Sequence, residues 1–296
     1  MIGFYLTLLS LFAWVGLWKA TVQAQDKALL AELVSAAKKE GVIEYYGPGT
    51  MTPMDAQRLA APFNKKYGLD IKLNFHPAGN MVRDAGRVVS LAAAGLPPEW
   101  DLMVMSDGIH ATLWLRNLHQ RFDYRKLGVG SQLIEFDGGV VSFANQYVLP
   151  AYNTKVLPAK DVPKSLGTPA EVDTRLQIGE ILVFVNQIDS YIHTAKKSGA
   201  PLAVAGGVEP VISPAFQAGV PKGAKHPNVS HLFAAFLATP EAQGLWEQFV
   251  GQSSPFIPGT TMHKFAQGKK MLYLRADEAK LVDRLAREYA KILGFR

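Results

Sequence analysis

Polar side chains recur at the points where a predicted strand ends and a helix or turn begins. The residues that could hold a ligand there are Tyr45, Tyr46, Thr50, Asn80, Ser106, Asp107, Tyr152, Asn153 and Tyr191. On an α/β sheet such turns lie along one edge, where helix N-termini also offer N–H groups. The pattern indicates a binding site, although each residue alone could equally be a helix cap or a turn.

Catalytic signatures are missing from the sequence. HExxH, GxSxG, GxxxxGK[ST] and GxGxxG patterns do not occur. The seven histidines are scattered, and the nearest pair, His226 and His231, would lie on different faces of a helix start. An enzyme would need a nucleophile with its base or a metal cluster, so we expect the chain not to be an enzyme.

Composition narrows the choice of partners. The 296 residues are 48% hydrophobic and 19% charged, with a formal net charge of +6 that is spread along the chain. Because Lys and Arg do not form runs interleaved with aromatic residues, nucleic acid is not expected as a partner. The absence of cysteine excludes disulfides, thiolate metal sites and a lipidated N-terminal cysteine.

The N-terminal region is typical of a cleavable signal peptide. Residues 4–18 are uncharged and apolar, and fifteen residues is short for a bilayer span. The segment Val22-Gln23-Ala24 fits a cleavage site, so residues 1–24 would be removed and the protein would be periplasmic. The front end lacks the usual Lys or Arg, which leaves an uncleaved membrane anchor or a buried helix as alternatives.

The first part of the chain alternates helices with short apolar strands. Predicted helices cover residues 26–40, 52 onward, 80–94 and 109–118, and predicted strands cover 42–46, 69–75 and 101–105. Thr52, Pro53 and Asp55 form a helix start of the capping-box type. This alternation predicts an α/β fold with a parallel sheet.

Residues 140–165 are predicted to carry the chain out of one lobe into a second, with residues 208–220 as the return. Further on, strands are predicted at 181–186 and 201–205, and helices at 189–197, 226–238, from 239 and at 278–293. Two connections between two α/β units place a cleft between them.

In this order the motifs resemble the extracytoplasmic solute-binding proteins of ABC importers, in the branch that includes the periplasmic ferric-ion-binding proteins. The segments that carry the resemblance are IEYYGPG, FNKKYGLDIKL, DLMVMSDGIHATLWLRNL, QYVLPAYNTKVLPAKDVPKS, GEILVFVNQIDSYIHTAKKSGAP, VEPVISPAFQAGVPKGAKHPN and HLFAAFLATPEAQGLW. They cover most of residues 26–296.

The resemblance implies a two-lobed periplasmic-binding-protein type II fold with crossing hinge strands. Lobe 1 would comprise residues 25–109 and 207–260, and lobe 2 residues 110–206 and 261–296. The ligand would lie in the cleft between them, and a monomer would deliver it to an inner-membrane ABC permease driven by a separate ATPase.

Two departures from the family pattern bear on the function. Only residues 166–177 stand where the family has a longer region, so the second lobe looks shortened. Ferric binders of this branch use two adjacent tyrosines, where this chain has Ser190-Tyr191, and their first-turn histidine falls near Gly49. Asp107 matches the family's third-turn glutamate, and Asp107 with Tyr191, joined by Tyr45, Tyr46 or Tyr152, gives an incomplete set of oxygen ligands for Fe(III). The transported ligand is therefore expected to be either Fe(III) or a small anionic or polar solute.

Other functions fit the same residues. The chain could be a ligand-sensing periplasmic receptor for a signalling partner, since the binding physics would be the same. A hydrolase on this α/β layout would need a nucleophile that is not evident. The shortened second lobe also allows a truncated homologue that binds no ligand.

Overall fold

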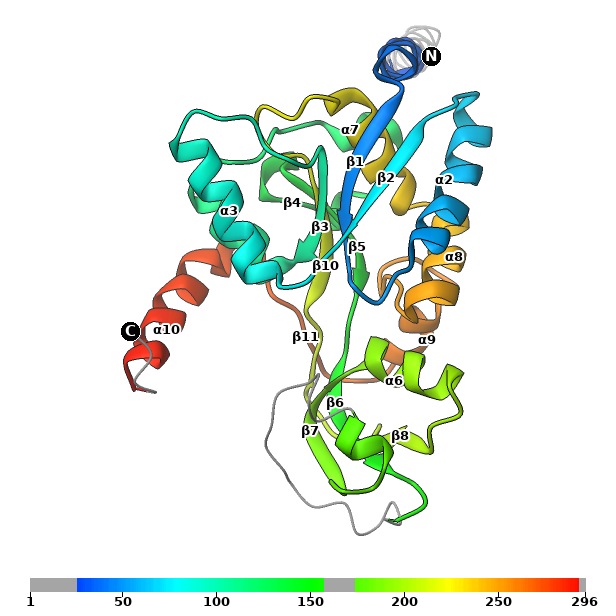
Figure 1. The fold of residues 1–296 in the computed structure, drawn as a ribbon, viewed down its shortest axis with the longest axis vertical. Helices are drawn as coiled ribbons and strands as arrows, with labels where there is room; N and C mark the ends of the chain where they lie inside the picture. Colours follow the sequence, from blue (N-terminus) through cyan, green and yellow to red (C-terminus); the bar gives the residue numbers. More distant parts are fainter. Residues whose placement is uncertain (1–25, 157–173, 293–296) are drawn as a thin grey trace, which may run out of the picture.

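The computed structural model describes residues 26–156 and 174–292. The predicted signal peptide at 1–24, and much of the predicted exit of the 140–165 crossing, lie outside these residues. The described chain forms a large lobe and a small lobe, each built on its own β-sheet (Figure 1). This arrangement agrees with the predicted two-lobed α/β architecture.

The large lobe contains a mixed sheet of six strands in the order β2-β1-β3-β10-β5-β4. The strands are β1 (Val42–Gly47), β2 (Lys72–Pro77), β3 (Leu102–Ser106), β4 (Ile134–Glu135), β5 (Val140–Asn145) and β10 (Ala215–Gly219). β1 is parallel to β2 and β3, whereas β10 runs antiparallel to β3 and β5. The carboxyl ends of the three parallel strands therefore meet at one edge.

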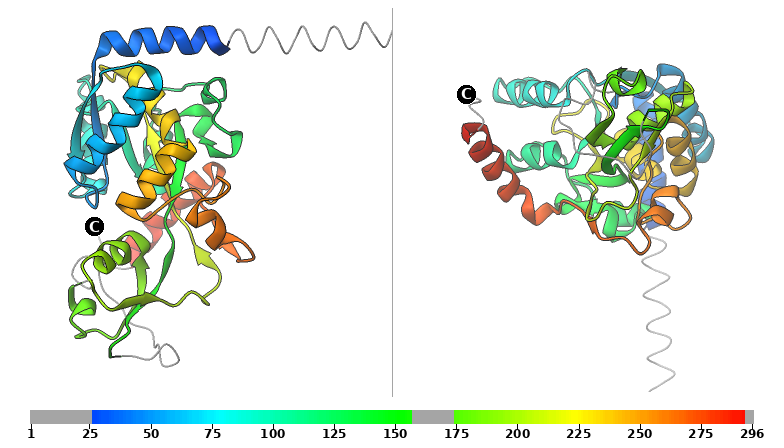
Figure 2. Two further views of the ribbon diagram at one scale, coloured as in Figure 1. Left: turned by 90° about the vertical axis from the view of Figure 1, so that its right-hand side faces the viewer. Right: turned by 90° about the horizontal axis from the view of Figure 1, so that it is seen from below.

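Helices cover both faces of this sheet. α2 (Pro53–Tyr67), α7 (Pro227–Leu237), α8 (Pro240–Val250) and the helix over residues 26–40 share one core, while α3 (Met81–Ala93) and α4 (Asp107–Leu115) pack on the opposite face. Alternation along β3 explains the two cores, because Leu102 and Val104 point to one and Met103 and Met105 to the other. The helix over 26–40 lies across the end of the large lobe that is farthest from the small lobe (Figure 2).

Local sequence signals set several helix starts. The Thr52 side chain accepts from the Asp55 N–H while the Asp55 carboxylate accepts from the Thr52 N–H, which is the predicted capping box. Thr239 caps α8 by accepting from the Ala242 N–H, and Pro240 occupies the first helical position. The predicted α2 and α8 starts are confirmed.

The small lobe is built on a sheet in the order β11-β9-β6-β7, with β8 also pairing with β6. Its strands are β6 (Val148–Asn153), β7 (Val183–Ile188), β8 (Leu202–Val204), β9 (Val211–Ile212) and β11 (Met271–Leu272), and α6 (Asp189–Lys197) packs on it. Its buried cluster consists of Ala151, Leu176, Phe184, Ile192, Ala195 and Leu202. This core is much smaller than that of the large lobe.

Two antiparallel connections cross between the lobes. The chain leaves at residues 146–147 between β5 and β6, and returns at residues 213–214 between β9 and β10. The predicted outward and return crossings are confirmed. Two further connections flank β11: residues 267–270 lead to it from α9 (Thr261–Ala266), and the chain after it returns through η5 (Ala276–Glu278) to α10 (Ala279–Ile292), which contacts α4.

The lobe boundaries differ from the expected ones at residues 110, 207 and 261. Residues 207–212 belong to the small lobe, because β9 pairs in its sheet. β4 and β5 pair within the large sheet, so residues 110–145 belong to the large lobe and not to the second. The end of α10 nearest η5 also packs on the large lobe. The reason is β10, which returns between β3 and β5 and so holds residues 140–145 in that sheet.

The irregular part of the large lobe was not predicted. It consists of the short helices η1 (Tyr124–Leu127), η2 (Ser131–Leu133) and η3 (Phe136–Gly138), and α9 (Thr261–Ala266) follows α8. Their short lengths give no periodic pattern to detect. None of the helices formed by residues 26–156 and 174–292 is long and apolar enough to cross a membrane.

Candidate functional site

A cavity of about 660 Å³ lies between the two lobes at the edge where the parallel strands end. It is lined by Pro48, Gly49, Thr50, Ala78, Gly79, Met81, Ser106, Asp107, Gly108, Gln146, Ile188, Ser190, Tyr191, Pro214 and Phe216. These residues come from the turns after β1, β2 and β3, from both hinge crossings and from the start of α6. The predicted site residues Thr50, Ser106, Asp107 and Tyr191 are among them.

The turn after β1 supplies Thr50. Gly49 makes a close approach to the neighbouring turn, because a Cβ at this position would lie 2.6 Å from the carbonyl oxygen of Ala78. Glycine therefore lets the β1 turn and the β2 turn meet at the cavity wall. The Thr50 hydroxyl is buried and has no hydrogen-bond partner among the residues that the structure describes. A hydroxyl left unpaired beside a cavity is available to a ligand.

The start of α4 supplies Ser106 and Asp107. Ser106 is the N-cap of α4, yet its side chain makes no capping hydrogen bond. The Asp107 carboxylate accepts from the N–H groups of Gly108 at 2.7 Å and Ala215 at 2.8 Å, and thereby ties α4 to the return crossing. Burial raises the pKa of Asp107 to about 6, against the opposing effect of the two backbone hydrogen bonds.

The start of α6 supplies Ser190 and Tyr191 from the small lobe. Beside them the buried Asp189 carboxylate accepts from the Ser190 N–H at 2.9 Å and from the Gln252 amide at 2.8 Å. Gln252 follows α8, so this hydrogen bond joins the small lobe to the large one. Burial raises the pKa of Asp189 to about 7.

Gln146 was missed by sequence reasoning. It lies on the outward crossing, lines the cavity and is only 6% exposed. Its backbone bonds to Pro214 and Ser213, while its side-chain amide forms no hydrogen bond with any residue that the structure describes. Its position directly after the apolar strand at 140–145 is the signal that could have identified it.

Two of the predicted tyrosines lie in the cores and do not line the cavity. Tyr45 is fully buried against Phe75 and Phe233, and burial raises its pKa far above the ordinary value. Tyr46, on the opposite face of β1, donates to Asp84 at 2.9 Å and packs on Trp100. Both precede the end of β1, and strand alternation directs their side chains into the two helix layers instead of over the sheet edge.

Three further predicted residues also lie away from the cavity wall. Asn80 is exposed and caps α3 by accepting from the Arg83 N–H at 3.0 Å. Asn153 is buried and donates to the carbonyl oxygens of Leu176 and Gln177, so it joins the end of β6 to the segment before β7. Tyr152 is half-buried on β6, between β7 and β8.

The metal ligands predicted for Fe(III), Asp107 and Tyr191, both line the cavity. No cluster of three or more His, Asp or Glu side chains that could hold a metal occurs within residues 26–156 and 174–292. Both oxygens of Asp107 already accept backbone hydrogen bonds. The cavity therefore offers a ferric ion one engaged carboxylate and one phenol.

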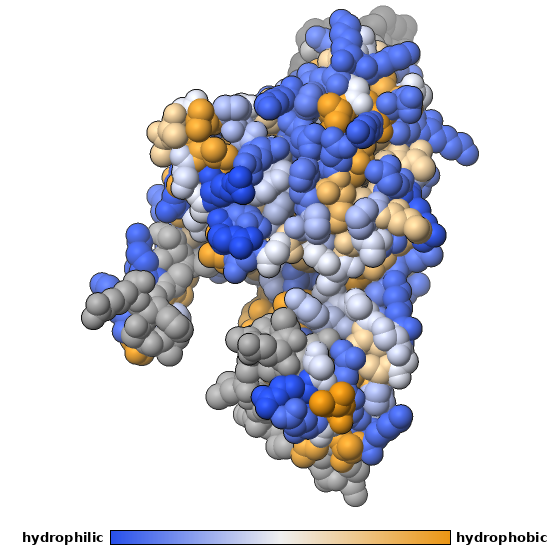
Figure 3. All heavy atoms as spheres, in the orientation of Figure 1, coloured by the Kyte–Doolittle hydropathy of each residue, from blue (hydrophilic) through white to orange (hydrophobic). Residues whose placement is uncertain are grey.

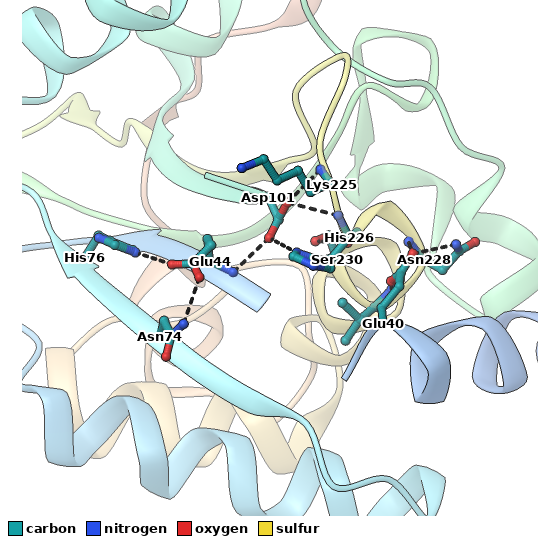
Figure 4. A network of polar contacts seen from close by, with 10 residues as sticks. Glu40, Glu44, Asn74, His76, Asp101, Lys225, His226, Asn228 and Ser230 are labelled. Carbon is teal, nitrogen blue, oxygen red and sulfur yellow. Dashed lines mark hydrogen bonds and ion pairs between the residues drawn. The ribbon is translucent and has the colours of Figure 1, made fainter. Parts of the chain in front are cut away.

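A second polar cluster lies at the opposite edge of the large sheet (Figure 4). The buried Asp101 carboxylate accepts from the N–H groups of Glu44, Lys225 and His226 and contacts the His226 ring at 2.7 Å. Glu40 caps α7 in the same region through the N–H groups of Asn228 and Val229. Because these carboxylates are committed to backbone groups, the cluster holds α7 onto the sheet.

Comparisons with known proteins identify the fold. No family model and no curated protein matches this sequence. Among solved structures, the chain is similar to a substrate-binding protein of an ABC transporter from Agrobacterium tumefaciens, with a TM-score of 0.65 and 12% identity over 85% of this chain and 96% of that one.

Two structures with bound ligands are also similar. A Trichodesmium protein (IdiA, FutA) in complex with iron and citrate matches with a TM-score of 0.62 and 13% identity over 86% of this chain and 98% of that one. The protein AgtB from A. tumefaciens R10, in complex with agropinic acid, matches with a TM-score of 0.59 and 16% identity over 84% and 98%. The chain thus has the type II periplasmic-binding-protein fold found in substrate-binding proteins of ABC transporters.

Proposed function

We propose that this protein is the extracytoplasmic solute-binding component of an ABC importer. It would capture a small polar or anionic solute between its lobes in the periplasm and present it to an inner-membrane permease with its ATPase. The observation that carries the proposal is the cavity itself, whose wall combines the starts of α3 and α4 from one lobe, the start of α6 from the other, and both hinge crossings. A ligand there would hold the lobes together.

The cavity chemistry favours a solute with hydrogen-bond acceptors over a bare ferric ion. Cavity groups for which the described residues supply no hydrogen-bond partner include the hydroxyl of Thr50 and the amide of Gln146, and the Ser106 hydroxyl makes no cap. These groups can donate to an oxyanion or a carboxylate. The starts of three helices add positive partial charge at the same place.

A melting-shift screen tests this function. Amino acids, oxyanions, polyamines and ferric citrate would be added to the purified protein, and a ligand at about 100 times its Kd should raise Tm by roughly 5–10 °C. Ser106→Ala should weaken binding about 10-fold because one hydrogen bond to the ligand is lost. Ser198→Ala, at the exposed far end of α6, is the matched control.

The pH dependence of binding would give the sign of the ligand charge. Below about pH 6 the Asp107 carboxylate becomes protonated, so an anion should bind more tightly and a cation more weakly, and Asp107→Asn should remove the difference. Ligand-dependent uptake that is lost in cells lacking this protein would support the importer over a receptor. If no ligand class shifts Tm, the proposal fails in favour of a homologue that binds nothing.

A further inference from the structure

The C-terminal helix α10 is anchored to the body at one end only. Ala279, its first residue, is buried in a cluster with Ala111, Phe136 and Val140. Beyond this turn the helix leaves the large lobe and runs outward, and its far end stands apart from the body in Figure 1 and in the right-hand view of Figure 2. In the space-filling view the coloured atoms of α10 project to the side of the large lobe (Figure 3).

One side of α10 carries large apolar side chains in solvent. Leu281, Leu285, Tyr289 and Ile292 are spaced four, four and three residues apart, which places them along one stripe of a helix. Leu281 is 41% exposed, Tyr289 58% and Ile292 76%, and Leu285 is half-buried. In a soluble helix such a stripe normally faces a core, and among residues 26–156 and 174–292 nothing covers this one.

A second side of α10 is basic. Lys280, Arg284, Arg287 and Lys291 are spaced four, three and four residues apart, so they form a parallel row on another side of the helix. All four side chains are exposed. Over the same helix the sequence has two acidic residues, Asp283 and Glu288, and Glu288 lies 3.8 Å from Arg284. The polar side of α10 is therefore positively charged.

We propose that α10 binds the surface of an anionic lipid membrane. An apolar stripe beside a row of Lys and Arg is the pattern of helices that lie in the membrane interface, where the stripe enters the headgroup region and the cations pair with lipid phosphates. A second copy of this chain would bring the same positive charge to the contact, whereas anionic lipid neutralises it. The attachment is independent of solute capture and would hold the protein near a membrane-bound partner.

Vesicle binding tests the proposal. The purified protein, with its N-terminus established by mass spectrometry, would be sedimented with vesicles of phosphatidylethanolamine and phosphatidylglycerol at 7:3, and with pure phosphatidylcholine vesicles. We expect at least 10-fold tighter binding to the anionic vesicles, and weaker binding as salt rises. An uncleaved 4–18 segment would insert into either vesicle, so only variants with the same N-terminus are compared.

Two variants of α10 separate the contributions of the apolar stripe and of the basic row to vesicle binding. Leu281→Ser/Tyr289→Ser/Ile292→Ser removes the exposed stripe, and Lys280→Gln/Arg284→Gln/Lys291→Gln removes most of the basic row. Each should weaken binding to anionic vesicles at least 10-fold. The controls Met54→Ser/Leu96→Ser and Lys65→Gln/Lys66→Gln, at exposed positions elsewhere, should bind as the parent protein does. Unchanged melting curves would show that every variant is folded.

Three outcomes would overturn the proposal. The first is equal binding to neutral and anionic vesicles, and the second is α10 variants that bind like the parent protein. The third is a dimer, detected by light scattering, that dissociates in the stripe variant, since the occupant of the stripe would then be a second copy.

Discussion

The two lobes share an architecture but differ in how they are stabilised. Among the described residues, the main buried cluster of the large lobe contains 35 hydrophobic side chains, including Phe63, Phe233 and Trp246, whereas that of the small lobe contains six. Because stabilisation scales with the apolar area removed from water, the large lobe can fold on its own core. The small lobe must depend on the hinge strands and on contacts with its neighbour.

Those contacts with the large lobe are polar and concentrate on α6. Lys197 donates to the carbonyl oxygen of Gln248 at 2.6 Å, near the end of α8, and Gln252 donates to Asp189. The His193 ring lies against Gly251, where a Cβ would collide with it. The large lobe is thus stabilised mainly by its own core. The small lobe depends in addition on the interface of α6 with the large lobe, which also borders the cavity.

The largest effect expected is from truncating matched core phenylalanines in the two lobes. Phe233→Ala should cost about 3–5 kcal/mol and lower the main thermal transition, because Phe233 packs among Tyr45, Phe63 and Phe236. Phe184→Ala should unfold the small lobe early and leave the main transition in place. Calorimetry combined with hydrogen exchange would measure the unfolding of each lobe separately. If both variants shift one single transition equally, the two lobes do not differ in how they are stabilised.

The interface should lose stability as pH rises. Burial raises the pKa of Asp189 from an ordinary 3.8 to about 7. The contribution of Asp189 to the free energy of unfolding is therefore complete below pH 3.8 and is lost as pH rises through 7. Between pH 4.5 and 7.5 the parent protein should lose about 3 kcal/mol relative to Asp189→Asn. Urea unfolding at both pH values measures this, and a parallel pH dependence in the two proteins would refute it.

The large lobe should behave in the opposite way. Burial lowers the pKa of His231 from 6.5 to about 3. The contribution of His231 to the free energy of unfolding is therefore complete above pH 6.5 and is lost as pH falls toward 3. In the parent protein the Tyr124 hydroxyl lies 2.8 Å from His231 Nδ1, and the amide of the His231→Gln variant can still form a hydrogen bond with this hydroxyl. From pH 7 to 4.5 the parent protein should lose roughly 2–3 kcal/mol relative to this variant, measured by urea unfolding. No difference would show that the imidazole is charged when folded.

The smallest effect expected is from the surface contact of α6 with α8. Lys197→Gln removes a cation from the last carbonyl groups of α8 and should cost about 0.3–1 kcal/mol. Lys196→Gln is the neighbouring control, since no contact of the Lys196 side chain with the end of α8 occurs among the described residues. A Tm loss shared by both variants would assign the effect to net charge instead of to the α8 contact.

Much of the fold was predictable because its signals are local. The Thr52–Asp55 capping box, the Asn80 cap and the strand-turn-helix alternation up to residue 115 occur close to where the sequence places them. The short helices of residues 124–138 and the true lobe boundaries were not predictable. The boundaries depend on β10 pairing with β5, a contact between segments about 70 residues apart.

The candidate site was predictable only in part. Thr50, Ser106, Asp107 and Tyr191 line the cavity, as strand ends should. Tyr45 and Tyr46 do not line the cavity, because β1 continues to Gly47 and both side chains still point into the helix layers on either face of the sheet. The residue at which a strand ends is not visible in the sequence. Gln146 belongs to no recognisable sequence motif. It reaches the cavity because it lies where the outward crossing leaves the large sheet.

The sequence by itself determined the α/β class, the order of elements, the two crossings and the amphipathic character of α10, since these follow from periodicity, caps and turns within short windows. Only the tertiary structure decided which polar residues meet at the cavity, which carboxylates are buried, and that the apolar stripe of α10 faces solvent. Those properties depend on what packs against each side chain, and the packing partners come from distant parts of the chain.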